Sequence, residues 1–160
     1  MDTKFFRKDA EEDSFNIRID YHGTWYHDGR PIERTRLAKL FSSVLHYDPE
    51  NDDYWLITPH EQGRIDVEDA PYVITECNYD DDRLVFTTNL GHTVIPSPDH
   101  AIILKNNIPY CITTNNVPAR INRQIREDLI NIALAQNGFN EESGQLLLRA
   151  NGHDHVIASS

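Results

Sequence analysis

The sequence has little of what marks a membrane or secreted protein. No run approaches the roughly eighteen consecutive apolar residues of a membrane helix, and residues 1–6 lack the apolar core of a signal peptide. The two cysteines, Cys77 and Cys111, stand alone, with no Cys-x-x-Cys pair. Isolated cysteines are typical of reduced thiols, so we expect a cytoplasmic protein that does not contact a membrane.

The common catalytic signatures are also missing. There is no Gly-x-Ser-x-Gly elbow, no Walker A loop and no Gly-x-Gly-x-x-Gly fingerprint. His60 and Glu61 begin like a zinc-protease motif, but Arg64 stands where the second histidine ligand is required. His153 and His155, two residues apart, are more typical of exposed polar residues than of a zinc site. We therefore name no catalytic residue, no metal ligand and no cofactor.

Positive charge is outnumbered, since 15 Lys and Arg face 26 Asp and Glu and leave a net charge of −11. Residues 48–82, called the acidic segment below, hold twelve acids and one base, so the whole excess lies there. Its densest runs, 48–53 and 78–82, are typical of solvated turns. A chain this negative argues against binding of bulk nucleic acid or of an anionic membrane.

Two amphipathic helices are predicted from apolar spacing. The first starts near residue 34 and buries one stripe, formed by Leu37, Leu40, Phe41, Val44 and Leu45. The second runs from about Pro118 to Ala135, and its buried face is formed by Ile121, Ile125, Leu129 and Ile132. Bases gather around both predicted starts, where backbone NH groups already favour anions: Arg30, Arg34, Arg36, Lys39, Arg120, Arg123 and Arg126.

Strands separated by turn residues make up most of the remaining chain. They are expected at 17–21, 24–27, 54–58, 64–67, 72–77, 84–88, 93–95, 101–104, 108–113 and 145–150. A shift of 84 residues lays the turn at His22 on that at Asn106, Tyr26 on Tyr110, and Leu37 on Ile121. The order hairpin, helix, strand thus occurs twice. This favours an internal duplication, with two unrelated units of equal spacing as the alternative.

Three sets of residues are candidates for ligand contact. Trp25 and His27 lie on one face of a predicted strand and suit a planar base, unless Trp25 simply packs in the core. The arginines at the helix starts suit phosphate, unless they pair with the acidic segment. Glu61, Glu68 and Asp69 can accept hydrogen bonds, although acids in turns usually only end strands or cap helices.

Several stretches resemble one uncharacterised bacterial family. They are residues 23–32 (GTWYHDGRPI), 40–41, 54–59 (YWLITP), 65–72 (IDVEDAPY), 86–89 (FTTN), 107–110 (NIPY) and 119–123 (ARINR). They are similar to domain-of-unknown-function family twelve-eighty-five over nearly the whole chain after residue 15, with residues 67–71 the most specific part. The resemblance implies a duplicated core, a second domain like pleckstrin-homology folds, and a signalling role. It also implies a nucleotide-like ligand between the domains.

We therefore expect an α+β protein of two related domains, 14–71 and 72–160, each built on a hairpin, a helix and a strand. The second is expected to be a pleckstrin-homology-like antiparallel sheet with a helix. The leading hypothesis is a non-enzymatic module of bacterial signalling that binds a nucleotide-like molecule. The alternatives are a metal- or carboxylate-dependent hydrolase and a protein-interaction domain that uses the acidic segment. The predicted ligand contacts are Trp25, His27, Arg34, Arg36, Glu61, Glu68, Asp69, Tyr110, Arg120 and Arg123.

Overall fold

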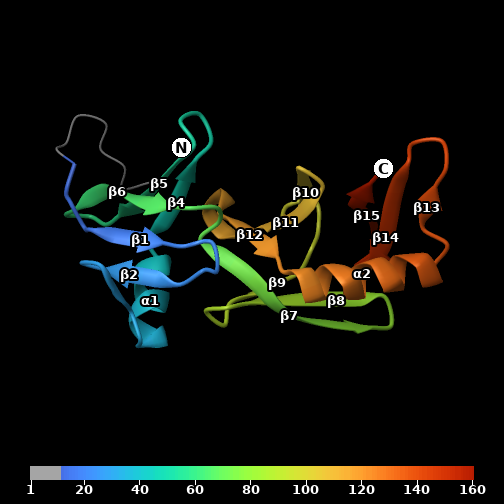
Figure 1. Ribbon diagram of the computed structural model, residues 1–160, viewed down its shortest axis with the longest axis horizontal. Helices are drawn as coiled ribbons and strands as arrows, with labels where there is room; N and C mark the ends of the chain where they lie inside the picture. The colour runs from blue at the N-terminus through green and yellow to red at the C-terminus, as the bar shows by residue number, and fades with distance from the viewer. Residues whose placement is uncertain (1–11) are drawn as a thin grey trace. The chain divides into compact units, whose positions relative to one another are not determined.

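The computed structural model describes residues 12–160, which divide into two compact units (Figure 1). The N-terminal unit ends at Pro71 and takes in Asn115–Val117 from later in the chain. The C-terminal unit comprises Tyr72–Thr114 and Pro118–Ser160. No helix among the described residues is long and apolar enough to cross a membrane.

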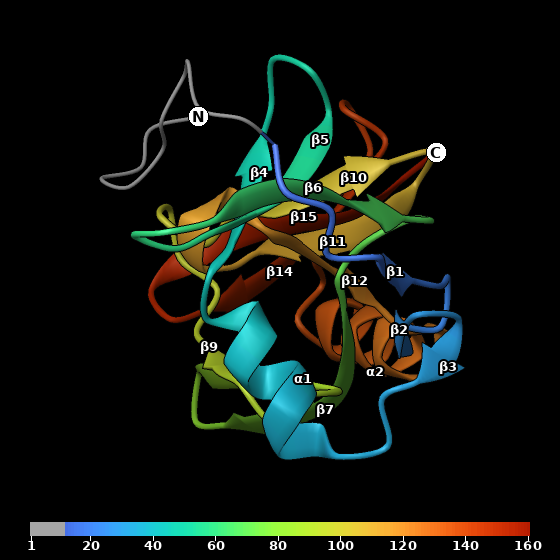
Figure 2. The ribbon, with the colours of Figure 1, turned by 90° about the vertical axis from the view of Figure 1, so that its left-hand side faces the viewer.

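The N-terminal unit is one six-stranded sheet with one helix. Its elements are β1 (Ile17–Ile19), β2 (Trp25–His27), β3 (Arg30–Pro31), α1 (Thr35–Ser42), β4 (Leu45–Asp48), β5 (Asp53–Ile57) and β6 (Gln62–Val67). The strand order is β3-β2-β1-β6-β5-β4, and the two central strands, β1 and β6, run parallel. Figure 2 shows the chain leaving β3 through a short loop, forming α1 and continuing into β4.

The C-terminal unit has a second six-stranded sheet, a longer helix and a small third sheet. The first sheet is formed by β7 (Tyr72–Asp80), β8 (Arg83–Thr88), β9 (Thr93–Val94), β10 (Ile102–Lys105), β11 (Ile108–Ile112) and β12 (Pro118–Ile121). A short 3-10 turn, Thr114–Asn116, precedes β12. Then follow α2 (Arg123–Ala135), β13 (Phe139–Asn140), β14 (Gln145–Ala150) and β15 (His153–Ser159).

The two large sheets share one strand order. The strand order of the second sheet is β10-β11-β12-β7-β8-β9. In each sheet, the strand that comes first in the chain lies at the centre, beside the strand that comes last. These central strands are parallel in both units, β1 with β6 and β7 with β12. The sheets therefore correspond by matching β1 to β7, whereas the shift of 84 residues laid β1 near β10. The alignment by 84 residues was wrong because it matched two hairpins by their turn spacing, which does not depend on where a hairpin lies in its sheet.

The sheet of the C-terminal unit is mixed, which corrects the expected antiparallel sheet. Its parallel pair joins β12 to β7, with Ala119 opposite Tyr72 and Ile121 opposite Ile74. Parallel neighbours are joined by long connections rather than turns, so local turn signals did not reveal the pair. The α+β class is correct, since both units combine sheets with a single helix.

Helix α2 begins later than the spacing predicted. Pro118 and Ile121 belong to β12, and Asn122 caps the helix because its Oδ1 accepts a hydrogen bond from the Ile125 N–H (2.8 Å). Ile125 and Leu129 are buried as expected, but the third buried residue is Ala133 and not Ile132. An asparagine cap after a strand therefore decides where the helix starts.

Helix α1 is shorter than predicted and turns a different side toward its unit. It ends at Ser42, and Leu45 lies in β4. Its buried residues are Ala38 and Ser42, whereas Leu37 is 39% and Leu40 64% exposed. The predicted burial of these two leucines is wrong, because the helix packs through its small residues, which permit a close approach. Periodicity identifies an apolar stripe but not the edge of it that is covered.

Candidate functional site

Trp25 lies in the core of the N-terminal unit. It is 2% exposed and stands opposite Ile19 in the β1–β2 pair. Its indole therefore packs against the core, and the expected wall for stacking a base is not available in this conformation. The side chain of His27 is 49% exposed, since it lies at the end of β2, where it pairs with Arg30 of β3.

Four exposed basic residues precede α1 or lie on it, and we call them the α1 basic surface. They are Arg30, Arg34, Arg36 and Lys39, of which Lys39 lies in the last turn of the helix. Arg34 is the N-cap residue, its side chain makes no capping hydrogen bond, and the first turn holds no acid. The partial positive charge of the helix start therefore adds to the guanidinium charges.

The β2–β3 hairpin brings an aromatic ring against the last turn of α1. The His27 ring lies 6.4 Å from the Phe41 ring, centroid to centroid, at 51°. Phe41 is half-buried and belongs to α1. His27 thus lies against the helix that follows Arg34 and carries Arg36, but at its last turn, whereas the two arginines lie at its start.

The three predicted carboxylates are not brought together. Glu61 precedes β6 and Glu68 and Asp69 follow it, so the six-residue strand separates them by about 20 Å. The Glu68 carboxylate has a structural role, since its Oε2 accepts a hydrogen bond from the Tyr21 N–H (2.7 Å). Glu61 therefore lies too far from Glu68 and Asp69 to contact the same part of a small ligand.

In the C-terminal unit, Tyr110 and Arg120 stand opposite each other on β11 and β12. They are 6% and 7% exposed. A guanidinium this deeply buried must be matched by hydrogen bonds or counter-charge within the fold. Arg123 differs, because its side chain is 85% exposed and its Nε lies 3.5 Å from Glu127 Oε1. The two arginines therefore do not present one surface.

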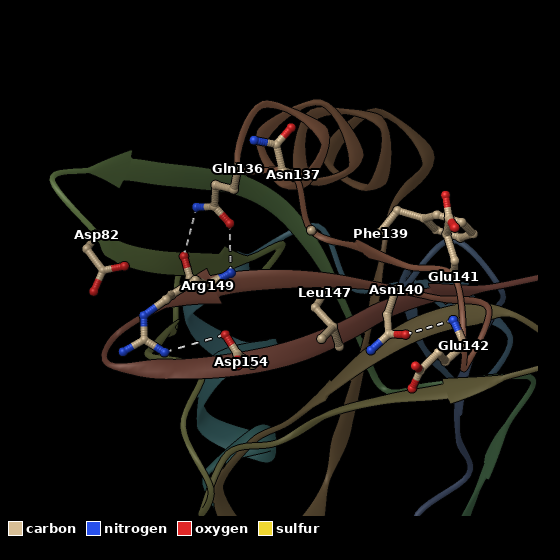
Figure 3. A pocket seen from close by; sticks show the side chains of 11 residues that line it. Asp82, Gln136, Asn137, Phe139, Asn140, Glu141, Glu142, Leu147, Arg149 and Asp154 are labelled. Atoms are coloured by element: carbon tan, nitrogen blue, oxygen red, sulfur yellow. Dashed lines mark hydrogen bonds and ion pairs between the residues drawn. The ribbon is translucent and has the colours of Figure 1, made fainter.

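The C-terminal unit also has a pocket of about 790 Å³ that sequence reasoning missed (Figure 3). It lies between the end of α2, the β7–β8 turn and the small sheet. It is lined by Asp82, Gln136, Asn137, Gly138, Phe139, Asn140, Glu141, Glu142, Leu147, Arg149 and Asp154. No predicted contact is among them, because four separate segments of the chain supply them; the acidic turn at 80–82 was the only visible signal.

Hydrogen bonds and an ion pair connect three of the residues that line this pocket (Figure 3). The Gln136 amide accepts from the Arg149 N–H (2.8 Å) and donates to the Arg149 carbonyl (3.0 Å). The Arg149 Nη1 lies 3.4 Å from Asp154 Oδ1. Asp82, Glu141 and Glu142 leave the lining negative, so its potential attracts cations and opposes a phosphate.

Two further hollows lie on sheet surfaces. One, of about 750 Å³, runs along β7 and β8 and includes Glu76, Cys77 and Thr87. The other, of about 480 Å³, lies on the N-terminal sheet and includes Arg18, Asp66 and Glu68. Acids outnumber bases in the lining of both, so neither favours an anion over a cation.

The two thiols are poorly suited to nucleophilic chemistry. Burial raises the pKa of the half-buried Cys77, and Asp128 nearby raises it further. Burial raises the pKa of Cys111 to about 12. A thiol reacts as the thiolate, so both are protonated at neutral pH. Among residues 12–160, no three His, Cys, Asp or Glu residues are grouped so that they could hold a metal ion.

Comparison with known proteins agrees with the two-unit division. Residues 8–70 match the family model described as "Domain of unknown function (DUF1285), N-terminal domain", and residues 71–157 match "Protein of unknown function (DUF1285), C-terminal domain". This is the family twelve-eighty-five to which the motifs were assigned. No curated protein matches the chain.

Two solved structures are similar to this one. A DUF1285 family protein from Silicibacter pomeroyi DSS-3 is 26% identical, covers 91% of this chain and 80% of its own, and has a TM-score of 0.74. A DUF1285 family protein from Shewanella baltica OS155 is also 26% identical, covers 72% of this chain and 91% of its own, and has a TM-score of 0.61.

Proposed function

Given that this chain belongs to the DUF1285 family, whose function is unknown, we propose that it is a non-enzymatic ligand-binding module of bacterial signalling. Its ligand is a small nucleotide-like molecule that carries phosphate, and it binds at the α1 basic surface. The sequence resemblance supports the signalling role. The residues around α1 support the place of binding.

One observation carries the proposal: the start of α1 is left without its own acidic or capping group. Arg34 makes no side-chain cap and the first turn contains no acid, while Arg34 and Arg36 are exposed. Guanidinium groups bind phosphate through paired N–H donors. At the start of α2, by contrast, Asn122 caps the helix and Arg123 pairs with Glu127. The α2 start is therefore already occupied by the protein's own side chains.

The exposed edge of His27 beside Phe41 supports the nucleotide-like part of the proposal. The two rings lie at 6.4 Å and present an aromatic surface at the last turn of α1, the helix that carries Arg36. Planar bases pack favourably against such rings. This surface takes the role that the sequence had assigned to Trp25.

The arrangement of reactive groups supports binding without chemistry. The pKa of each thiol is raised, so neither is an activated nucleophile. Glu61 lies at one end of β6 and Glu68 at the other, which is too far apart for a carboxylate pair acting on one bond. We also keep the pleckstrin-homology likeness of the C-terminal unit as part of this proposal, supported by its sheet followed by α2.

The test is isothermal titration with AMP, ADP, GMP, GDP and inorganic phosphate, with and without Arg34→Ala/Arg36→Ala. Binding of at least one nucleotide is expected, and the double variant should weaken it at least tenfold. Arg123→Ala is the matched control, because Arg123 is also an exposed helix-start arginine, and it should change little. Absence of binding across the panel, or an equal loss in both variants, overturns the proposal. Hydrolysis of the nucleotide during titration would favour the hydrolase instead.

The second candidate is a protein-interaction domain, here through α1 and not through the acidic segment, and a specific observation favours it. Leu37 and Leu40 are exposed on α1 next to the basic residues. A small phosphorylated ligand does not need them.

A further inference from the structure

We propose that the exposed face of α1 is a docking site for an acidic amphipathic segment of a partner protein. The site consists of Leu37 and Leu40, the half-buried Phe41 and Val44 beside them, and the α1 basic surface around them. The proposal goes beyond the nucleotide-like ligand, because that ligand needs the arginines and this partner also needs the leucines.

The apolar part of the site is a continuous strip on one side of the helix. Positions three and four apart lie next to each other on a helix, so Leu37 neighbours both Leu40 and Phe41. Leu40, at 64%, is the most exposed of the large apolar side chains that the structure describes, and Leu37 is 39% exposed. Leaving two neighbouring leucines in water is unfavourable at roughly 25 cal/mol per Å². A grouped apolar surface of this kind is typical of a binding site.

The helix is held in place by its other side. Ala38 and Ser42, one turn apart, are 2% and 6% exposed. The Ser42 hydroxyl donates to the Lys39 carbonyl (2.7 Å), and the Ser43 hydroxyl donates to the Leu40 carbonyl (2.6 Å). These bonds satisfy acceptors in the last turn, where helical carbonyls lack partners. The leucines therefore project from a helix that is fixed without them.

The charge around the leucines selects the partner. Residues 29–47 hold four bases, Arg30, Arg34, Arg36 and Lys39, and one acid, Glu33, so this stretch is net +3 in a chain of −11. A segment with leucine-like side chains on one face and Asp or Glu at its edges complements both features. Charged rims of this kind mainly determine specificity and association rate, while the apolar contacts supply affinity.

Charge also disfavours a second copy of this chain and an anionic membrane as occupants of this face. A second copy that met this surface by two-fold symmetry would place the four bases against themselves. An anionic membrane repels the net charge of −11 over its whole plane. A partner segment that docks on α1 meets mainly the nearby charges, because screening at physiological ionic strength acts over about 8 Å, and Arg36 and Lys39 lie on this helix.

The test uses synthetic peptides of about 18 residues, long enough to form a helix. One carries Leu on one face and Glu on the other, the second replaces Glu by Lys, and the third has the first composition in scrambled order. Binding is measured by fluorescence anisotropy. The Leu/Glu peptide should bind at least tenfold more tightly than either of the others, and its affinity should fall as salt is raised.

Leu37→Ser/Leu40→Ser is expected to weaken binding of the Leu/Glu peptide at least tenfold. Leu134→Ser is the matched control, because Leu134 is a leucine of α2 that is 54% exposed, and it should bind like the unmodified chain. Thermal unfolding of both variants checks that the fold is retained. Absence of saturable binding, equal binding of the scrambled peptide, or an equal loss in the control overturns the proposal.

Two further measurements separate this site from its alternatives. Binding to phosphatidylglycerol vesicles without binding to the Leu/Glu peptide would identify a membrane surface and overturn the proposal. Nucleotide binding should survive Leu37→Ser/Leu40→Ser, since it depends on Arg34 and Arg36. If the unmodified chain binds the Leu/Glu peptide but no nucleotide, only the proposed function fails; if it binds a nucleotide but not the peptide, only this proposal fails.

Discussion

The side-chain amide of Asn151 pairs with both polar groups of the Leu84 backbone. Asn151 Oδ1 accepts from the Leu84 N–H at 3.0 Å, and Asn151 Nδ2 donates to the Leu84 carbonyl at 3.0 Å. The same Nδ2 donates to the Pro96 carbonyl at 3.0 Å. One residue in the β14–β15 turn thus joins the small sheet of the C-terminal unit to the β7–β8 hairpin.

Replacing Asn151 is expected to destabilise the C-terminal unit. Asn151→Gly removes three hydrogen bonds but keeps a residue suited to the positive φ of 55° found there. We expect a loss of roughly 2–4 kcal/mol in the free energy of unfolding, measured with urea. Asn151→Ala should cost about 1 kcal/mol more, because alanine also disfavours this backbone conformation. Equal stability of the glycine variant and the unmodified chain would show that the amide contributes nothing.

Trp25 should matter for stability and not for ligand binding. Its indole is 2% exposed, so Trp25→Ala should destabilise the N-terminal unit by about 3–5 kcal/mol. Trp25→Phe should cost much less, because Trp25 Nε1 has no hydrogen-bond partner within residues 12–160. Titration of the phenylalanine variant with the nucleotide panel measures binding directly. A large loss of affinity in that folded variant would restore the role in stacking.

Tyr47 should make stability depend on alkaline pH. Burial, with the hydrogen bond from Tyr47 to Asp52 (2.7 Å), raises the pKa of this phenol from its usual 10 to about 12. The folded state thus holds the proton more tightly, so the stabilisation is complete below pH 10 and is lost as pH rises toward 12. Tyrosinate absorbance during a pH titration should show a late-titrating part that becomes smaller in Tyr47→Phe, while Tyr26, whose pKa is also raised by its hydrogen bond to Asp20, still contributes to it. An unchanged titration would contradict this.

The two cysteines should differ in their reaction with a thiol reagent. Cys111 is fully buried and has its pKa raised to about 12, so it should react only after unfolding. Cys77 is half-buried and should react slowly in the folded protein. The rate of labelling by a disulfide reagent, compared between Cys77→Ser and Cys111→Ser, assigns each thiol. Fast labelling of the variant that keeps only Cys111 would show that the C-terminal unit opens locally.

Helix α1 shows what apolar spacing can predict about a helix and what it cannot. The pattern from Leu37 to Val44 predicted a helix at the right place, and α1 covers Thr35–Ser42. It could not show that Ala38 and Ser42 would be covered and Leu40 exposed, because every residue of a stripe has the same period. Burial depends on which neighbours approach, and these come from other parts of the chain.

For the candidate site too, some features were visible in the sequence and others were not. The clustering of Arg30, Arg34, Arg36 and Lys39 before and within one helix was visible in the sequence, as was the cap at Asn122 once the helix start was known. The pocket of Figure 3 was not visible, because its lining joins Asp82 to residues more than fifty positions later. The pairing of Tyr110 with Arg120 likewise requires the register of β11 and β12.

Residue types and local spacing were enough to predict the family, the α+β class, most strands, both helices and the concentration of negative charge in the acidic segment. These depend on residue type and short-range spacing, which a chain shows before it folds. Three features became known from the folded chain alone: the two sheets share one strand order around a parallel pair, Trp25 lies in the core, and Leu40 is exposed. These depend on contacts between distant segments, whose energies are set by what is buried together.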